Sequence, residues 1–189
     1  MEFIKIYDNA IEPELCDEII RIFEANSERQ LDGMIGGENG GHVDTKKQRC
    51  KDVILTPEVS RTTLEKLQAT IKKYYTEYVE TTSYLHNFSL IDEPWRIKKY
   101  NKREGFFNWH ADHTPYAKDR LLSVIFYLND VEEGGQTLFD LDQKIKDVKP
   151  VKGRLLIFPS LFCYKHKGSI PFSHDKYVIV SWLNITNLQ

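Results

Sequence analysis

The stretch RLLSVIFYLN, residues 120–129, is a short apolar run rich in β-branched and aromatic side chains. A run of this length and composition, bounded by charged and turn-forming residues, predicts a β-strand. Both of its alternating sets of side chains are mostly apolar, so neither face is expected to meet solvent. We therefore predict a strand with one face inside a β-structure and the other face covered by N-terminal helices.

Further short β-rich runs lie on both sides of this strand, and all of them follow Pro94. Clusters of Gly, Pro, Asn and Asp separate them, which is typical of consecutive short strands. A series of short strands of this kind indicates a sandwich or a barrel. The predicted strands are residues 95–100, 105–110, 120–129, 136–140, 144–150, 153–160 and 176–185.

The part of the chain before Pro94 has the periodicity of helices. Residues 11–26 follow a helical spacing after a proline, and residues 57–82 place apolar and aromatic side chains three or four apart. The alternation in residues 3–7 predicts a short strand. Residues 27–51 are polar and glycine-rich with no period, so we predict a mobile surface loop of the kind that often serves as a lid or binds substrate.

These elements predict an α+β, mainly β fold. We expect a double-stranded β-helix, or jelly roll, with the N-terminal helices packed on one sheet. A length of 189 residues suits one domain. We therefore predict a single domain over residues 1–189, with residues 1–93 as a helical support that includes the 27–51 loop and residues 94–185 as the jelly-roll core.

The composition excludes some classes of protein. Hydrophobic residues make up 41% of the chain and charged residues 29%, a mixture typical of a folded globular protein. The net charge of -2 argues against broad binding to nucleic acid, and we expect Lys98, Lys99, Lys102 and Arg103 to lie on a solvated strand edge. No secretion signal or membrane-length apolar segment is present, and the three cysteines lack metal-site spacing, so we predict no membrane association and a cytoplasmic location.

His110 and Asp112 lie two residues apart at the end of a predicted strand, so both side chains point to one side and could hold one metal ion. The pattern alone is weak, because chance supplies about one such pair in this composition, and a second pair occurs at His42 and Asp44. That second pair lies in the glycine-rich segment, where no scaffold would hold a ligand fixed. His166 follows another apolar strand and would complete the two-histidine, one-carboxylate face used by non-haem Fe(II) oxygenases.

The order of these residues resembles that of Fe(II)/2-oxoglutarate dioxygenases of the prolyl 4-hydroxylase type. Lys176 lies ten residues after His166, and Trp182 lies six residues further on. The segments KKYNKREGFFNWHAD, DRLLSVIFYLNDVEEGGQTLF and VKGRLLIFPS are similar to the family's tyrosine-containing strand, its arginine-led strand with a Gly-Gly-x-Thr-x-Phe hairpin, and its Lys-Gly strand. The resemblance extends from Trp95 to Leu183, and the preceding residues match only as a helical support.

The resemblance implies a role for each of these residues. His110, Asp112 and His166 would be the iron ligands. Lys176 would pair with the far carboxylate of 2-oxoglutarate, because a buried carboxylate requires a cationic or hydrogen-bonding partner. The remaining implied contacts are Tyr127 and Thr137 as hydrogen-bond donors to the same carboxylate, Tyr100 in the co-substrate pocket, Trp182 in the pocket wall, and Arg120 near a peptide substrate.

The implied reaction consumes O2 and 2-oxoglutarate, releases succinate and CO2, and hydroxylates a C–H bond. The expected substrate is a prolyl residue in a peptide or protein, and the implied cofactors are Fe(II), 2-oxoglutarate and O2, with ascorbate as an optional addition. Asp112 favours hydroxylation over halogenation, because a halogenase of this type has a small residue in place of the carboxylate. Three alternatives stay open: a hydroxylase of a free amino acid or other small molecule, a non-catalytic jelly-roll binding module, and a nucleic-acid oxygenase, which the acidic charge disfavours.

Other residues near the motif are expected to have ordinary structural roles. His113 directly follows Asp112 and should face away from the metal. His174 is predicted to lie in a surface turn. Cys163 is predicted to be a buried thiol with no chemical role. The oligomeric state is not determined by the sequence.

Overall fold

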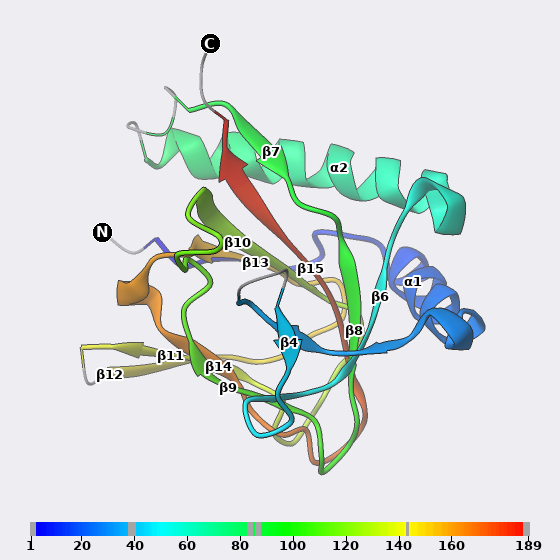
Figure 1. Cartoon of the computed structure of the whole chain (residues 1–189). Helices are drawn as coiled ribbons and strands as arrows, with labels where there is room; N and C mark the ends of the chain where they lie inside the picture. Colours follow the sequence, from blue (N-terminus) through cyan, green and yellow to red (C-terminus); the bar gives the residue numbers. More distant parts are fainter. Residues whose placement is uncertain (1–2, 38–40, 83–84, 86–87, 143, 187–189) are drawn as a thin grey trace.

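The computed structural model describes residues 3–37, 41–82, 85, 88–142 and 144–186. Within these residues, two antiparallel sheets enclose a core, and two helices lie on the outer side of the larger sheet (Figure 1). The α-helices are α1 (Pro13–Ala25) and α2 (Pro57–Glu80), and the 3-10 turns include η1 (Ser27–Arg29) and η4 (Phe162–Tyr164).

The larger sheet has β10 and β15 at its centre. It holds eight strands among the described residues, and the eighth, β7 (Leu90–Asp92), pairs with one end of β15. The other seven strands are, in spatial order, β1 (Lys5–Tyr7), β13 (Leu155–Pro159), β10 (Arg120–Tyr127), β15 (Lys176–Ile185), β8 (Arg96–Tyr100), β6 (Lys51–Ile54) and β2 (Leu31–Asp32).

The smaller sheet lies opposite the inner face of the larger one and carries part of the candidate site. Figure 1 shows β11, β12 and β14 on the side of the molecule away from α2. The five strands described in this sheet are, in spatial order, β12 (Lys144–Val148), β11 (Thr137–Leu141), β14 (His166–Gly168), β9 (Phe106–His110) and β5 (Gln48–Arg49), and a separate pair consists of β3 (Met34–Ile35) and β4 (His42–Val43).

Both faces of strand β10 are buried, as its sequence predicts. Val124 and Phe126 pack with the helices on the outer face of the larger sheet. Ile125 and Tyr127 pack on the inner face, where Tyr127 shares a cluster with Phe139 of the smaller sheet. Because the side chains of a strand alternate between its faces, one apolar strand contributes to both layers of the core. The predicted mainly β fold with helices on one sheet is confirmed.

The two helices bury the stripes that predicted them. In α1 the buried residues include Leu15, Ile19 and Phe23, spaced four apart, and in α2 they include Leu67 and Ile71. Each helix has a proline in its first turn. Backbone amides in the first turn donate no intrahelical hydrogen bond, so proline, which lacks this hydrogen, removes none. The helical periodicity in the sequence therefore identified both the helices and their buried faces.

The prediction that residues 27–51 form a loop without regular structure is wrong. This segment holds η1 and the short strands β2, β3, β4 and β5. Leu31 pairs with Asp52, and Gln48 pairs with Phe107, so the segment adds an edge strand to each sheet. Strands of two residues are too short to show a period, and the partners of β2 and β5 lie elsewhere in the two sheets. Residues 38–40 lie outside the described residues.

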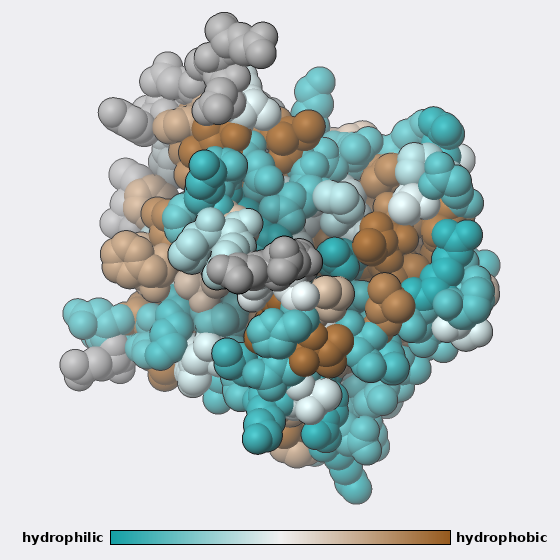
Figure 2. All heavy atoms as spheres, in the orientation of Figure 1, coloured by the Kyte–Doolittle hydropathy of each residue, from teal (hydrophilic) through white to brown (hydrophobic). Residues whose placement is uncertain are grey.

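The molecular face shown in Figure 2 is mostly hydrophilic, with hydrophobic side chains in separate patches. Such scattered apolar residues are normal on a folded protein. No helix in the described part of the chain is both long and apolar enough to cross a membrane.

Candidate metal centre and adjoining cavity

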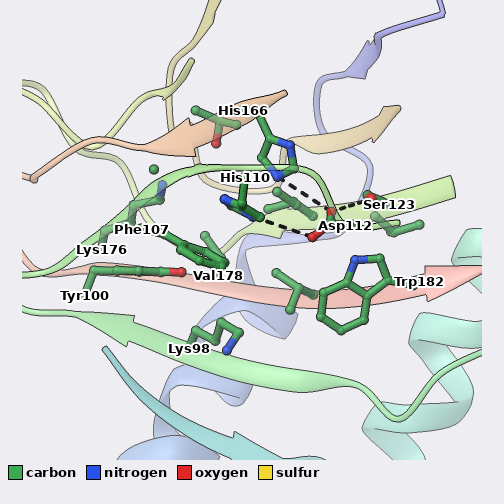
Figure 3. A pocket seen from close by; sticks show the side chains of 15 residues that line it. Lys98, Tyr100, Phe107, His110, Asp112, Ser123, His166, Lys176, Val178 and Trp182 are labelled. Carbon is green, nitrogen blue, oxygen red and sulfur yellow. Dashed lines mark hydrogen bonds and ion pairs between the residues drawn. The ribbon is translucent and has the colours of Figure 1, made fainter. Parts of the chain in front are cut away.

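Strand pairing brings the two predicted histidine ligands together. His110 is the last residue of β9 and His166 is the first residue of β14, and the two lie directly opposite each other in this antiparallel pair. Asp112 follows two residues after His110 in the turn that leaves β9. One potential ligand atom from each of the three residues lies within 4.8 Å of the others, and the three side chains point toward one another (Figure 3).

Both imidazole rings are held with one nitrogen directed toward the centre. His110 Nδ1 lies 2.7 Å from the carbonyl oxygen of Asn108, and His166 Nδ1 lies 3.1 Å from that of Tyr164. A carbonyl oxygen only accepts hydrogen bonds, so Nδ1 carries the proton in each ring and Nε2 is left with a free lone pair. This is the tautomer that a histidine needs to bind a metal through Nε2.

The distances around Asp112 fit a metal ion. Its Oδ1 is 3.5 Å from His110 Nε2, and its Oδ2 is 3.6 Å from His166 Nε2. Three donors on one octahedral face, with metal bonds of about 2.1 Å, lie about 3 Å apart. The spacing found here is slightly wider, and it exceeds that of a direct hydrogen bond. Two imidazole Nε2 atoms and one carboxylate therefore form a donor set suited to Fe(II).

The environment of Asp112 favours its ionised form. Burial alone would raise the pKa of this carboxyl, but the adjacent His166 and His110 rings and the Ser123 hydroxyl outweigh burial and hold the pKa well below its ordinary range. Ser123 Oγ donates to Asp112 Oδ2 at 2.6 Å and lies 2.8 Å from Ser160 Oγ. The hydroxyl pair fixes the orientation of the carboxylate and leaves Oδ1 directed toward His110.

Burial keeps the His166 imidazole uncharged, and aromatic neighbours hold both histidine rings in place. Burial, followed by the nearby His110 ring, lowers the pKa of His166 to about 4, so the imidazole is uncharged at neutral pH. The Phe107 ring stacks on His110 at a centroid distance of 3.5 Å, and the Phe158 ring contacts His166 edge-on at 4.7 Å. These aromatic contacts restrict both rings to the geometry that aims their free nitrogens at the centre.

A buried ammonium group lies in the same cavity as the three candidate ligands. Lys176 is only 4% exposed, and burial lowers its pKa to about 7. Its Nζ donates to the carbonyl oxygen of Gly135 at 2.7 Å and lies over the rings of Tyr100 and Tyr127 at 5.4 and 5.5 Å. No described acidic side chain pairs with it. A buried cation without an acid partner is suited to bind an anion that enters the cavity.

The hydroxyl groups of Tyr127 and Thr137, which were predicted to donate to the co-substrate, are hydrogen-bonded to each other. Tyr127 Oη donates to Thr137 Oγ1 at 2.7 Å, and both residues are buried. Thr137 and Tyr100 line the cavity. Tyr127 is not among the lining residues and contacts Thr137 through the hydrogen bond. Burial raises the pKa of Tyr100 well above its ordinary value, so the phenol keeps its proton and can donate a hydrogen bond.

Trp182 lines the cavity, as predicted, and Arg120 lies behind it. The Arg120 guanidinium stacks on the Trp182 ring at 3.7 Å and makes two hydrogen bonds of 2.7 Å to the carboxylate of Glu93. It also approaches the carbonyl oxygen of Asp112 at 3.4 Å. The observed side-chain contacts of Arg120 are therefore with Glu93, with Trp182 and with the backbone of the turn that carries Asp112.

Two expectations about neighbouring residues are wrong. Cys163 is exposed, because it lies in η4 on the surface between β13 and β14. Lys98 is buried and lines the cavity, because alternation along β8 turns it to the inner face of the larger sheet. Other expectations are confirmed: His174 is exposed and pairs with Glu132 at 2.9 Å.

His42 and His113 also behave as expected. His42 is exposed in β4, which pairs with β3 and not with the strands that hold His110 and His166. His113 is absent from the described metal-ligating cluster, and its Nδ1 lies 3.4 Å from the carbonyl oxygen of Arg120. Both histidines therefore lie outside the candidate centre.

The sequence interpretation missed Ser123, Phe107 and Lys98 as residues that line the cavity. Ser123 was detectable, because it is a polar residue on the same face of β10 as Ile125 and Tyr127. A polar side chain on the inner face of a buried strand needs a partner, and Asp112 provides it. Lys98 had no such signal before its strand partners were known.

Comparison with known proteins finds one family that matches part of the chain. Residues 95–184 match the family described as the 2OG-Fe(II) oxygenase superfamily. A curated relative, probable prolyl 4-hydroxylase 9 of Arabidopsis thaliana, is 33% identical over 106 residues, which cover 46% of this chain and 36% of that protein. The chain thus matches about a third of the length of this relative.

Solved structures share the fold over nearly the whole chain. A prolyl-4-hydroxylase of Pseudomonas putida has a TM-score of 0.72 at 15% identity, covering 99% of this chain and 95% of its own. A viral collagen prolyl hydroxylase from Paramecium Bursaria Chlorella virus-1, in a 2OG complex, has a TM-score of 0.69 at 18% identity, covering 98% and 97%.

A third structure is a prolyl hydroxylase from Trichoplax adhaerens in complex with a peptide fragment of the hypoxia inducible factor oxygen degradation domain. Its TM-score is 0.71 at 19% identity, and the match covers 96% of this chain and 83% of that one. These likenesses confirm the predicted jelly-roll fold. Residues 95–184, the segment that matches the 2OG-Fe(II) oxygenase superfamily, contain all three candidate metal ligands and Lys176.

Proposed function

We propose that this protein is an Fe(II)- and 2-oxoglutarate-dependent oxygenase that hydroxylates a prolyl residue in a peptide or protein. The observation that carries the proposal is the presence, in one cavity, of a two-histidine, one-carboxylate cluster and a buried lysine without an acidic partner among the described residues. Such a cavity offers separate partners for a metal ion and for a dicarboxylate. The match of residues 95–184 to the 2OG-Fe(II) oxygenase superfamily supports this reading.

In the proposed mechanism, His110 and His166 would hold Fe(II) through Nε2, and Asp112 would hold it through a carboxylate oxygen. The hydrogen bonds from Nδ1 to backbone carbonyl oxygens orient the two rings before the metal binds. Ser123 keeps the carboxylate from rotating. When bound, Fe(II) with 2-oxoglutarate and O2 supplies an oxidative decarboxylation, which gives succinate and CO2, and the hydroxylation of a C–H bond.

The far carboxylate of 2-oxoglutarate would pair with Lys176, with Thr137 and Tyr100 as further hydrogen-bonding partners. The ammonium group is buried and desolvated, so an incoming carboxylate would meet little competition from water. Trp182 and the apolar side chains of β15 exclude water from the remaining cavity wall. The protein side chains thus orient the co-substrate and keep the reacting centre dry.

The prolyl substrate is proposed from the relatives. The Arabidopsis thaliana relative is a probable prolyl 4-hydroxylase, and the similar structures are prolyl hydroxylases, one of them in complex with a peptide. We also propose a cytoplasmic location, which agrees with the free thiols of Cys16, Cys50 and Cys163. Ascorbate is proposed as an auxiliary reductant that keeps iron in the Fe(II) state.

An anaerobic titration tests the metal centre directly. Purified apo-protein is mixed with Fe(II) and then with 2-oxoglutarate, and the weak visible absorption of the chelate is recorded. We expect absorption only when both are present, with loss of the signal in His166→Ala and retention in His174→Ala, a matched change at an exposed histidine. Peptides that contain proline are then screened for succinate release in air. Folded wild-type protein that develops no absorption would refute the proposed function.

A further inference from the structure

A charged cluster lies in the cavity wall across from the candidate metal ligands, and the proposed mechanism leaves it without a role. Lys98 lines the cavity, and Figure 3 shows it on the opposite side from His110. Its Nζ lies 3.0 Å from Asp52 Oδ2, and Arg96 Nη1 lies 3.3 Å from the same oxygen. The Lys98 and Asp52 side chains are 7% and 3% exposed, so this ion pair is buried.

Strand register separates this cluster from the Lys176 end of the cavity. On the inner face of the larger sheet, Tyr100 pairs with Lys176, and Lys98 pairs with Val178. Side chains on the same face of a strand are about 7 Å apart. Lys98 therefore lies one step further along the sheet than the proposed site for the far carboxylate of 2-oxoglutarate, on the way to Trp182.

The charges of the cluster do not cancel. Two cations, Lys98 and Arg96, share the single carboxylate of Asp52, so the net charge is positive. An ammonium group has three donors, and the one acceptor that Lys98 has among the described residues is Asp52. Asp52 does not itself line the cavity, so the group presented to an incoming molecule is the lysine cation.

A buried charge in a cavity wall destabilises the folded protein through its desolvation, whereas an apolar side chain would fill the same space without this cost. Val178 and Val180 already serve as apolar wall on the neighbouring strand. The remaining donors of Lys98 point to a ligand with acceptor oxygens. Arg96, with 31% of its side chain exposed, extends the positive region toward solvent.

We propose that Lys98, assisted by Arg96, binds a carboxylate of the substrate next to the C–H bond that is hydroxylated. Asp52 is a positioning residue that holds the ammonium group against the wall. The inference rests on the Fe(II)- and 2-oxoglutarate-dependent hydroxylation proposed above, and it specifies a carboxylate beside the hydroxylated carbon. The carboxylate belongs either to an acidic side chain adjoining the target prolyl residue of a peptide or to a free amino acid.

Binding of matched ligands tests this proposal without turnover. The protein is loaded with Mn(II) and 2-oxoglutarate, and ligand binding is measured by calorimetry. One set of probes is acetylated and amidated short peptides in which proline adjoins Asp, Asn or Lys. The other set is free L-proline and L-prolinamide, which differ only in the carboxylate. The variants are Lys98→Met, Lys98→Arg, the double variant Lys98→Met with Asp52→Asn, and Lys99→Met.

The wild-type protein is expected to bind the acidic member of one set about 10- to 100-fold more tightly than its amide, as for a hydrogen-bonded ion pair. Lys98→Met and the double variant are expected to lose this preference. The double variant also replaces the Asp52 carboxylate, so no buried carboxylate has lost its lysine partner. Lys98→Arg retains part of the preference. Lys99→Met retains all of it, because Lys99 faces the outer side of the same strand and pairs with Glu24 at 2.9 Å.

The set in which the preference appears identifies the source of the carboxylate. Equal binding of acid and amide in both sets overturns the proposal, as does tighter binding of the lysine peptide or a preference that persists in Lys98→Met. The anaerobic absorption with Fe(II) and 2-oxoglutarate, recorded on the same preparations, separates the two hypotheses. Normal absorption without a Lys98-dependent preference refutes this inference alone, whereas absence of the absorption refutes the proposed function.

Discussion

Replacing Lys176 with methionine is expected to stabilise the ligand-free protein at neutral pH and to abolish its response to 2-oxoglutarate. Burial lowers the pKa of Lys176 from 10.5 to about 7. At about 1.4 kcal/mol per pKa unit, burying the charged amine costs roughly 5 kcal/mol. Methionine fills a similar volume but cannot donate to the Gly135 carbonyl oxygen. The loss of this hydrogen bond reduces the stabilisation by roughly 2 kcal/mol. The net gain is therefore about 3 kcal/mol.

The pH dependence of this gain identifies its cause. Between pH 7 and 10.5 the unfolded chain binds a proton at residue 176 that the folded protein has released, so the stability of the wild-type protein rises with pH. The free-energy cost of burying the charged Lys176 amine is complete below about pH 7. It falls to roughly 2 kcal/mol at pH 9 and vanishes above about pH 10.5. The advantage of Lys176→Met should shrink across the same window.

Urea unfolding of the ligand-free proteins at pH 7 and pH 9 measures both effects. Lys99→Met serves as the control, because this lysine is on the outer face and pairs with Glu24. Addition of Mn(II) with 2-oxoglutarate should raise the unfolding midpoint of the wild-type protein and leave that of Lys176→Met at its Mn(II)-only value. The reasoning fails if Lys176→Met is the less stable protein at pH 7, or if 2-oxoglutarate stabilises it as much as the wild type.

Two further substitutions test the supports of the candidate metal centre. Ser123→Ala removes the hydroxyl that donates to Asp112 Oδ2 and should weaken Mn(II) binding about 10- to 100-fold in a spectroscopic titration, so unchanged affinity would count against its positioning role. Arg120→Ala leaves Glu93 without its two hydrogen bonds and Trp182 without its stacking partner, and should lower the free energy of unfolding by about 1–3 kcal/mol in urea. Arg120→Lys should restore less than half of that loss because it cannot reproduce the paired geometry, and full restoration would contradict this account.

The sequence by itself determined the local elements and the type of chemistry. Two apolar faces on residues 120–129 required a strand between two layers, and the helical stripes in α1 and α2 predicted the helices that cover it. The spacing of His110 and Asp112 suggested a metal site, and the order of His166, Lys176 and Trp182 carried the family resemblance. All of these signals are short-range periods or motifs, which do not depend on which strands are neighbours.

The tertiary structure alone decided which distant residues meet. β14 has three residues and no period, yet its pairing with β9 places His166 opposite His110. The pairing of β8 with β6 and β15 turned Lys98 from a predicted solvated lysine into a buried member of the cavity wall beside Asp52. In the 27–51 segment, β2 and β5 form by pairing with strands of the two sheets that lie outside this segment or at its end. Sheet register is a long-range property, because each hydrogen-bonded pair is fixed by the packing of the whole layer and not by the residues beside it in the chain.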